Sequence, residues 1–129
     1  MEQPQYLIDT NAVIDYLGKK LPISGMNFMN KVVDDYPNVS VISKIEVLGF
    51  NMLAEYHILC TNFINDTTVL DLTTDVVNAS ITIRKANKTK LADSIIAATA
   101  IVYDLVLITR NIDDFKNIPN LKFVDAHKQ

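Results

Sequence analysis

Five carboxylate side chains in this sequence are candidate ligands of a metal ion. They follow predicted strands or open predicted helices, and they are Asp9, Glu46, Asp93, Asp113 and Asp114. Carboxylates that lie close together repel each other unless a cation neutralises them, and an oxygen-only ligand set favours Mg²⁺ or Mn²⁺ over zinc. Such ions polarise a phosphodiester, lower the pKa of an attacking water and stabilise the leaving oxygen. The acids therefore indicate metal-assisted hydrolysis that needs no protein nucleophile.

Each of these acids also has a purely structural interpretation. Asp9 could cap the helix that follows it, and Ser43 and Glu46 have the spacing of a capping box. Asp93 could stabilise the start of its helix through the helix dipole, and the two adjacent acids near residue 114 could be solvated loop charges. Taken singly, the residues leave both interpretations open.

The elements that must position these acids alternate along the chain. Strands are predicted at residues 5–8, 39–42, 67–72, 105–109 and 122–124. The first two predicted helices run from the residue after Asp9 to residue 17 and from Ser24 to residue 36. A third begins at Ser43 and breaks after Tyr56, and a fourth begins at Thr73 or Thr74. The last two span residues 91–103 and 113–117. Strands that are apolar on both faces indicate a parallel sheet covered by helices on its two sides, a three-layer α/β/α sandwich. Ligands bind beyond the carboxyl ends of such strands, where several of the acids are expected.

Length and composition are those of one ordered globular unit. The chain has 129 residues, of which 49% are hydrophobic and only three are glycine, so it can bury an adequate core without staples. We therefore predict a single domain spanning residues 1–129.

The sequence carries no sign of export or membrane insertion. Cys60 is the single cysteine and cannot form an intrachain disulfide, and the N-terminus lacks the basic and apolar regions of a signal peptide. The longest apolar stretch, residues 95–103, is far shorter than the roughly 20 residues that span a bilayer. We expect a cytoplasmic protein with no membrane partner.

The net charge limits the class of nucleic-acid partner. A charge of −3 argues mildly against a protein that coats nucleic acid generally, because phosphate binding usually requires a basic surplus. Leaving four pocket carboxylates out of the count changes the balance from −3 to +1, so a nuclease is not excluded.

Four segments in order carry a family resemblance over nearly the whole chain. They are residues 7–11 (LIDTN), residues 40–43 (SVIS) leading to Glu46, residues 91–100 (LADSIIAATA), and residues 107–111 (LITRN) followed by Asp114 and Phe115. With them the sequence resembles the PIN-domain family, and within it the VapC-type ribonuclease toxins of bacterial toxin–antitoxin pairs.

The resemblance implies roles for individual residues. Asp9, Glu46 and Asp93 would be metal-binding acids, with Asp114 as the fourth. Many relatives place an aspartate where this chain has Asn111, a departure that leaves the number of bound ions open. The residues that would shape the site around the acids are Thr10, Asn11, Thr109 and Asn111.

The resemblance also implies a substrate and partners. It implies cleavage of structured RNA, commonly transfer RNA, by a homodimer that a small antitoxin holds inactive. Candidate RNA contacts are Arg84, Lys85, Lys88, Lys90 and Arg110, although the first four are equally compatible with cations that favour a helix end. An apolar collection on the early helices is a candidate surface for the antitoxin or the dimer mate, and comprises Met26, Phe28, Met29, Phe50, Met52, Leu53 and Tyr56.

Three other classes compete with the ribonuclease. Asp9 and its neighbours resemble the nucleophile loop of haloacid-dehalogenase-like phosphatases, but that loop needs a second acid where Asn11 stands. A response-regulator receiver would need paired acids near the first strand. A PIN-like module that binds RNA or protein without cleavage is the non-enzymatic alternative, and the presence of Asp9, Glu46 and Asp93 favours the enzyme.

Overall fold

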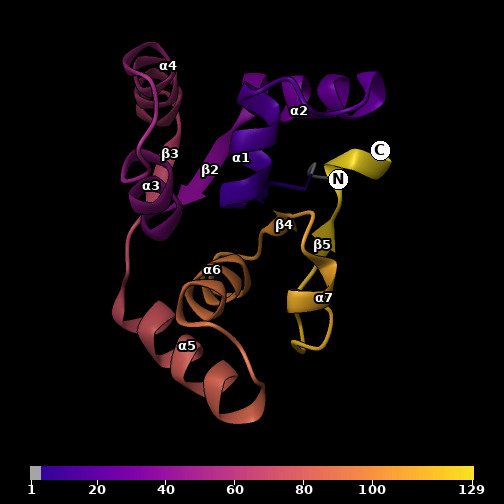
Figure 1. Ribbon diagram of the computed structural model, residues 1–129. Coiled ribbons are helices and arrows are strands. Elements are labelled where there is room, and N and C mark those ends of the chain that lie inside the picture. The colour runs from indigo at the N-terminus through magenta and orange to yellow at the C-terminus, as the bar shows by residue number, and fades with distance from the viewer. Residues whose placement is uncertain (1–3) are drawn as a thin grey trace.

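A five-stranded, all-parallel sheet forms the centre of the protein (Figure 1). The computed structural model describes residues 4–129. The strands are β1 (Tyr6–Ile8), β2 (Pro37–Ser40), β3 (Thr68–Leu70), β4 (Val106–Ile108) and β5 (Phe123–Val124), in the spatial order β3-β2-β1-β4-β5. In this order β1 is central, so the segment that follows it emerges in the middle of the carboxyl edge.

Helices cover both faces of the sheet, as the strand composition predicted. Figure 1 shows α2 and α4 at the top of the view, α1 beside β2, and α5, α6 and α7 in the lower part. The first three helices pack on one core cluster and the last three on the other. Their bounds are α1 (Thr10–Leu17), α2 (Ile23–Asp35), α3 (Val41–Leu48), α4 (Ala54–Asn65), α5 (Thr74–Ala86), α6 (Leu91–Val102) and α7 (Ile112–Phe115), and a 3₁₀ turn, η1 (Ala126–Lys128), ends the chain. The predicted three-layer α/β/α class is confirmed.

Strand alternation divides the core into two clusters. Ile8 and Ile108 face the cluster formed with α1, α2 and α4, whereas Leu7 and Leu107 face the cluster formed with α5, α6 and α7. Successive residues of a strand point to opposite faces, so each central strand contributes to both cores. Burial on both faces explains why these strands read as continuous apolar runs rather than alternating ones.

The structure corrects the predicted boundaries around α3. The second strand ends at Ser40, and the Ser40 hydroxyl accepts a hydrogen bond from the Ile42 amide at 3.1 Å, so Ser40 is the N-cap. The expected capping box beginning at Ser43 is therefore wrong, because Ser43 lies inside the helix and is buried.

The break between the two helical pieces also lies earlier than expected. Helix α3 ends before Gly49, and α4 begins at Ala54, rather than a single helix continuing through Tyr56. A Cβ on residue 49 would lie 2.7 Å from the Ile45 carbonyl oxygen, so glycine suits this helix end. Helix α2 likewise begins one residue before the predicted Ser24, directly after Pro22.

Within residues 4–129, no helix is both long enough and apolar enough to cross a bilayer.

Candidate active site

Asp9 lies where β1 turns into α1, and its carboxylate is almost fully buried. The side chain is 4% exposed, and the backbone N–H of Asp9 still continues the sheet by donating to the Ile108 carbonyl at 3.0 Å. Its Oδ1 accepts from the Thr10 amide at 2.8 Å, and its Oδ2 accepts from the Thr109 hydroxyl at 2.8 Å. The helix-capping interpretation of Asp9 thus holds together with its placement at the carboxyl edge.

Burial dominates the electrostatics of Asp9. It raises the pKa of this carboxyl from 3.8 to about 6, although the hydrogen bonds from Thr109 and Thr10 act in the opposite direction. The charges of Asp93 and Glu46 raise the pKa further. Because like charges act on it, Asp9 lies in the same negative field as two acids that are distant in sequence.

Glu46 approaches α1 from the exposed side of α3. The Thr10 hydroxyl donates to Glu46 Oε1 at 2.7 Å and lies 3.0 Å from the Ser43 hydroxyl. Ser43 therefore joins α1 to α3, a role that sequence reasoning missed because it assigned this serine to a cap. The visible signal was a serine three residues before Glu46, which is one helical turn.

Asp93 and Asp114 lie on α6 and α7, the helices on the other face of the sheet from α1. Asp93 is in the first turn of α6 and half-buried, and Asp114 is exposed on α7. Burial is the main factor that raises the pKa of Asp93, and the charges of Asp114 and Glu46 add to it while Lys90 opposes it. Asp113 points away instead, since its side chain is 91% exposed and pairs with Lys116 at 3.1 Å.

The donor set suits a hard cation, although the carboxylates are not gathered tightly around one point. No three His, Cys, Asp or Glu side chains in the described part of the chain lie close enough to hold an ion among them. The ligands on offer are oxygens only, and the mutual repulsion of Asp9, Asp93, Glu46 and Asp114 is what a bound cation would relieve. The residue types therefore fit Mg²⁺ or Mn²⁺.

A PIN-domain family model matches residues 53–121 of the sequence, which is more than half of the chain. The chain belongs to the PIN-domain family. PIN domains are generally nucleases, so this chain belongs to a family of nuclease type.

Solved structures of similar fold extend the match to almost the full length of this PIN domain. DNA-bound VapBC from Salmonella typhimurium matches with a TM-score of 0.82 and 25% identity over 96% of this chain and 99% of that chain. A toxin–antitoxin complex from Klebsiella pneumoniae gives 0.78 and 27% over 95% and 98%. VapBC2 from Rickettsia felis, bound to a promoter DNA fragment, gives 0.79 and 22% over 93% and 97%. A comparison with curated proteins gave no match.

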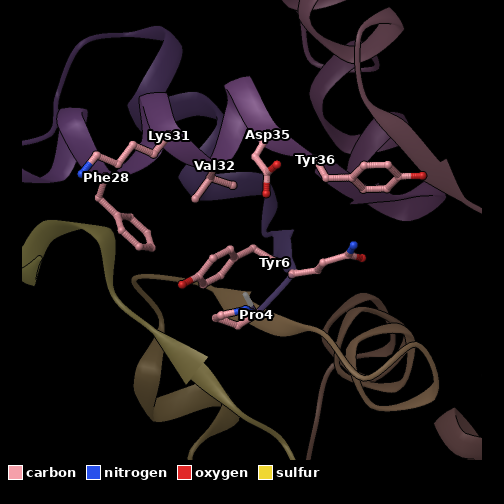
Figure 2. A pocket seen from close by; sticks show the side chains of 8 residues that line it. Pro4, Tyr6, Phe28, Lys31, Val32, Asp35 and Tyr36 are labelled. Carbon is pink, nitrogen blue, oxygen red and sulfur yellow. The ribbon is translucent and has the colours of Figure 1, made fainter. Parts of the chain in front are cut away.

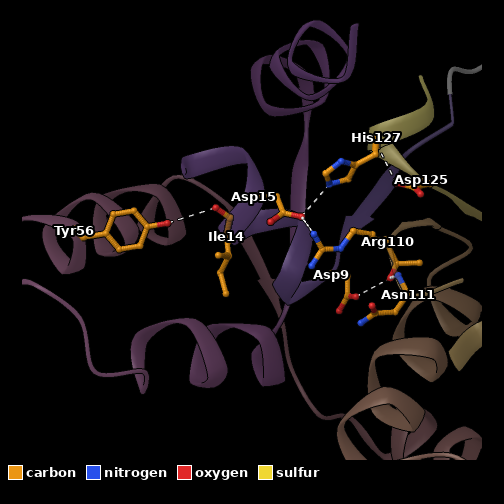
Figure 3. Close-up of polar contacts among 9 residues, drawn as sticks. Asp9, Ile14, Asp15, Tyr56, Arg110, Asn111, Asp125 and His127 are labelled. Atoms are coloured by element: carbon orange, nitrogen blue, oxygen red, sulfur yellow. Dashed lines mark hydrogen bonds and ion pairs between the residues drawn. The ribbon is translucent and has the colours of Figure 1, made fainter. Parts of the chain in front are cut away.

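The loop between β4 and α7 of the PIN domain wraps around Asp9. Thr109 is fully buried, and its hydroxyl accepts from the Asn111 amide at 3.0 Å while donating to Asp9. Figure 3 shows Asn111 beside Asp9. Asn11, on the first turn of α1, lines a shallow hollow with Thr10, Glu46 and Phe50.

A second buried carboxylate, on Asp15, went unnoticed in the sequence. Asp15 is 4% exposed, and its Oδ2 lies 3.2 Å from Arg110 Nη1 and 3.0 Å from His127 Nε2 (Figure 3). An acid within the apolar run of α1 was the available signal, but nothing in the sequence pointed to its partners near the other end of the chain.

The proposed RNA-contacting cations occupy two places in the PIN domain. Arg84 and Lys85 are in the last turn of α5, and Lys88 and Lys90 are in the connection to α6, which leads directly to Asp93. All four are exposed. Arg110 is half-exposed, follows β4 and lines a polar hollow with Asn111, Asp114 and Lys128.

The cleft in Figure 2 lies at the opposite edge of the sheet. Residues that precede β1 and β2 line it, together with residues of α2, and the Tyr6 and Phe28 rings meet edge to face with centroids 5.4 Å apart. Because it opens at the amino ends of the strands, this cleft is separate from the acids at their carboxyl ends.

Proposed function

We propose that this PIN domain is a metal-dependent endoribonuclease that hydrolyses RNA phosphodiester bonds, and that it is the toxin of a toxin–antitoxin pair. The observation that carries the proposal is the placement of Asp9 at the carboxyl edge of the sheet with Glu46, Asp93 and Asp114 on three helices around it. Burial is the main cause of the raised pKa of Asp9 and Asp93, and the charges of neighbouring acids add to it. A protein keeps such repulsion where it serves a function more often than where it serves stability.

Asp9, Glu46, Asp93 and Asp114 are the proposed ligands of Mg²⁺ or Mn²⁺. When bound, the ion would supply polarisation of the phosphodiester and activation of water. The chain's own contribution is orientation: Thr109 and the Thr10 amide hold Asp9 in one rotamer, and the Thr10 hydroxyl directs Glu46 toward α1. Outer contacts of this kind keep ligands aligned before the ion arrives.

A direct assay tests this function. The purified chain should cleave labelled transfer RNA in Mg²⁺ or Mn²⁺ and lose that activity in excess chelator, and its expression alone should arrest growth. RNA that is bound but never cut under any metal condition would favour the catalytically silent alternative. A covalent phosphate trapped on Asp9 would instead favour the phosphatase.

The exposed cations before α6 are the proposed RNA-binding surface, together with Arg110. We expect Arg84→Ala and Lys88→Ala each to weaken RNA binding uniformly across sequences and to reduce the salt slope by about 1, because each loses one phosphate contact. The measurement is the RNA dissociation constant at several salt concentrations. Lys31→Ala is the matched control, since Lys31 is an exposed cation at the opposite edge of the sheet. An unchanged salt slope in both variants would remove these cations from the interface.

The proposed protein partner is an antitoxin, because the structural neighbour from Klebsiella pneumoniae is a toxin–antitoxin complex. An apolar groove of about 590 Å³ runs between α1 and the α3–α4 connection, lined by Phe50, Met52, Leu53 and Tyr56. Phe50 and Leu53 are 67% and 81% exposed, whereas Met29 of the predicted surface is fully buried core. The groove shares Ile14 and Phe50 with the hollow beside Glu46, so an occupant would reach the acids.

We expect Phe50→Ser and Leu53→Ser to retain RNA cleavage but to escape inhibition by the cognate antitoxin. The physical reason is that loss of large exposed apolar side chains removes burial at the interface without opening a cavity in the core. Growth arrest during co-expression with the antitoxin is the measurement. Ile23→Ser is the control, because Ile23 is 82% exposed on α2 and outside the groove. Full inhibition of both groove variants would place the antitoxin elsewhere.

The homodimer that the family resemblance implies is part of the same proposal. Light scattering of the purified chain should give twice the 14.5 kDa mass of one copy.

A further inference from the structure

Asp15 is a buried acid that the proposed chemistry does not use. It is on α1, six residues after Asp9, and both of its side-chain partners come from the last 20 residues of the chain, namely Arg110 and His127. Removing the Asp15 carboxylate from water is costly, and its pairing with Arg110, whose side chain is 51% exposed, adds little net stability. The contact is better explained by the geometry that it specifies.

Arg110 connects this carboxylate to the loop that surrounds Asp9. Arg110 is the residue between Thr109, whose hydroxyl donates to Asp9 Oδ2 at 2.8 Å, and Asn111, whose amide donates to that same hydroxyl at 3.0 Å. The Arg110 side chain runs from this loop to α1, where it meets Asp15 Oδ2 (Figure 3). Anchoring Arg110 therefore restricts the main chain on both sides of it.

His127, in the C-terminal turn η1, is the second side chain that contacts Asp15. The turn that carries it is closed by a hydrogen bond from the His127 amide to Asp125 Oδ1 at 2.9 Å. Helix α2 lies directly against this turn, since a Cβ on Gly25 would come within 2.2 Å of the Ala126 carbonyl oxygen. The carboxylate thus contacts the C-terminal turn through His127 as well as the 109–111 loop through Arg110.

We infer that Asp15 is a positioning residue: by holding Arg110 it fixes the 109–111 loop, which in turn holds Asp9 in the orientation needed for metal binding. The inference rests on the proposed function for its consequence at the metal, but its structural part stands on these contacts alone. Asp15 acts through Arg110, so its loss should have no further effect once Arg110 is gone.

The first test follows the Asn111 amide by hydrogen exchange in the metal-free protein. Asp15→Asn, which is nearly isosteric, should accelerate exchange of this amide about tenfold, the factor expected from weakening one hydrogen bond. Amides of β4 report on global stability and should exchange as in the unaltered chain. Asp113→Asn is the matched control, because it removes an acid of the neighbouring helix that is 91% exposed. Unchanged exchange at Asn111 in Asp15→Asn would overturn the inference.

The second test measures the Mn²⁺ dissociation constant by calorimetry and the cleavage rate at saturating RNA. Asp15→Asn should weaken Mn²⁺ binding about tenfold, as expected for an outer partner of a metal ligand, and lower kcat with little change in KM. Arg110→Ala should show the same losses in Mn²⁺ affinity and kcat, and it should also raise KM because Arg110 is a proposed RNA contact. The double variant should be no worse than Arg110→Ala, and Arg110→Lys should recover part of the loss. Additive losses in the double variant would overturn the route through Arg110.

These outcomes separate the inference from the proposed function. If the unaltered chain neither binds Mn²⁺ nor cleaves RNA, the proposed function fails while the Asn111 amide still reports whether Asp15 holds the loop. If the unaltered chain is active and Asp15→Asn loosens Asn111 without affecting Mn²⁺ binding or kcat, Asp15 serves the fold alone and the inference is overturned.

Discussion

Asp9→Asn is expected to abolish RNA cleavage while the protein remains folded. Asparagine preserves the shape of the side chain and can still accept the Thr10 amide hydrogen bond, so the cap of α1 survives. What is lost is one of the proposed anionic metal ligands, at the centre of the carboxyl edge. Loss of a direct ligand should exceed the roughly 100-fold upper end of losses caused by outer partners. The measurement is the single-turnover cleavage rate of labelled transfer RNA in Mn²⁺.

Two companion variants sharpen this result. Asp93→Asn should fail in the same way, because Asp93 lies in the same negative field on a different element. Asp113→Asn should cleave normally, since its carboxylate faces solvent and pairs with Lys116. Full activity in Asp9→Asn would refute the assignment, and equal losses in all three variants would point to a general charge effect.

The metal-free protein is expected to lose stability as the pH rises through the range in which Asp9 ionises. Burial raises the pKa of Asp9 in the folded chain from 3.8 to about 6. A carboxyl with a raised folded-state pKa favours folding most below pH 3.8, and this contribution is lost as the pH rises through about 6. A shift of this size corresponds to about 3 kcal/mol of the free energy of unfolding.

Comparison with Asp9→Asn isolates this contribution from those of other groups. In chelator, the variant should become more stable than the unaltered chain by about 1 to 2 kcal/mol at pH 7, after allowing for the weaker Thr109 hydrogen bond, and the gap should close near pH 4. Denaturant unfolding at a series of pH values measures it. Added Mn²⁺ should stabilise the unaltered chain and leave the variant nearly unchanged. A stability difference that does not vary with pH would contradict the electrostatic origin.

The electrostatic cost of ionising Asp9 explains both the loss of activity and the gain in stability expected for Asp9→Asn. The fold places a carboxylate where burial and neighbouring acids disfavour its charge, and two hydrogen bonds hold it there in one orientation. Such a site is poorly suited to stability and well suited to a cation. Stabilisation by neutral substitution, together with loss of activity, is the expected signature of that arrangement.

The class of fold and the family could both be predicted from the amino-acid pattern. Apolar runs such as residues 105–109 are typical of strands buried on both faces of a parallel sheet between helices, and the acidic segments resemble those of the PIN-domain family, whose model matches this chain. Asp9 followed a strand in the sequence, and the local turn chemistry was enough to place it at the carboxyl edge. The roles of the individual site residues remain predictions.

Boundaries and distant partners were decided only by the tertiary structure. The sequence favoured Ser43 as the start of a helix, whereas in the structure β2 ends at Ser40, opposite Leu70 of β3, and Ser40 caps α3. Asp15 contacts Arg110 because the sheet order places β4 beside β1. It contacts His127 because the C-terminal turn packs against α2. Local propensity acts over a few residues, whereas contacts between residues about 100 positions apart depend on packing of the whole chain. That is why the acids could be read from the sequence and the network that holds them could not.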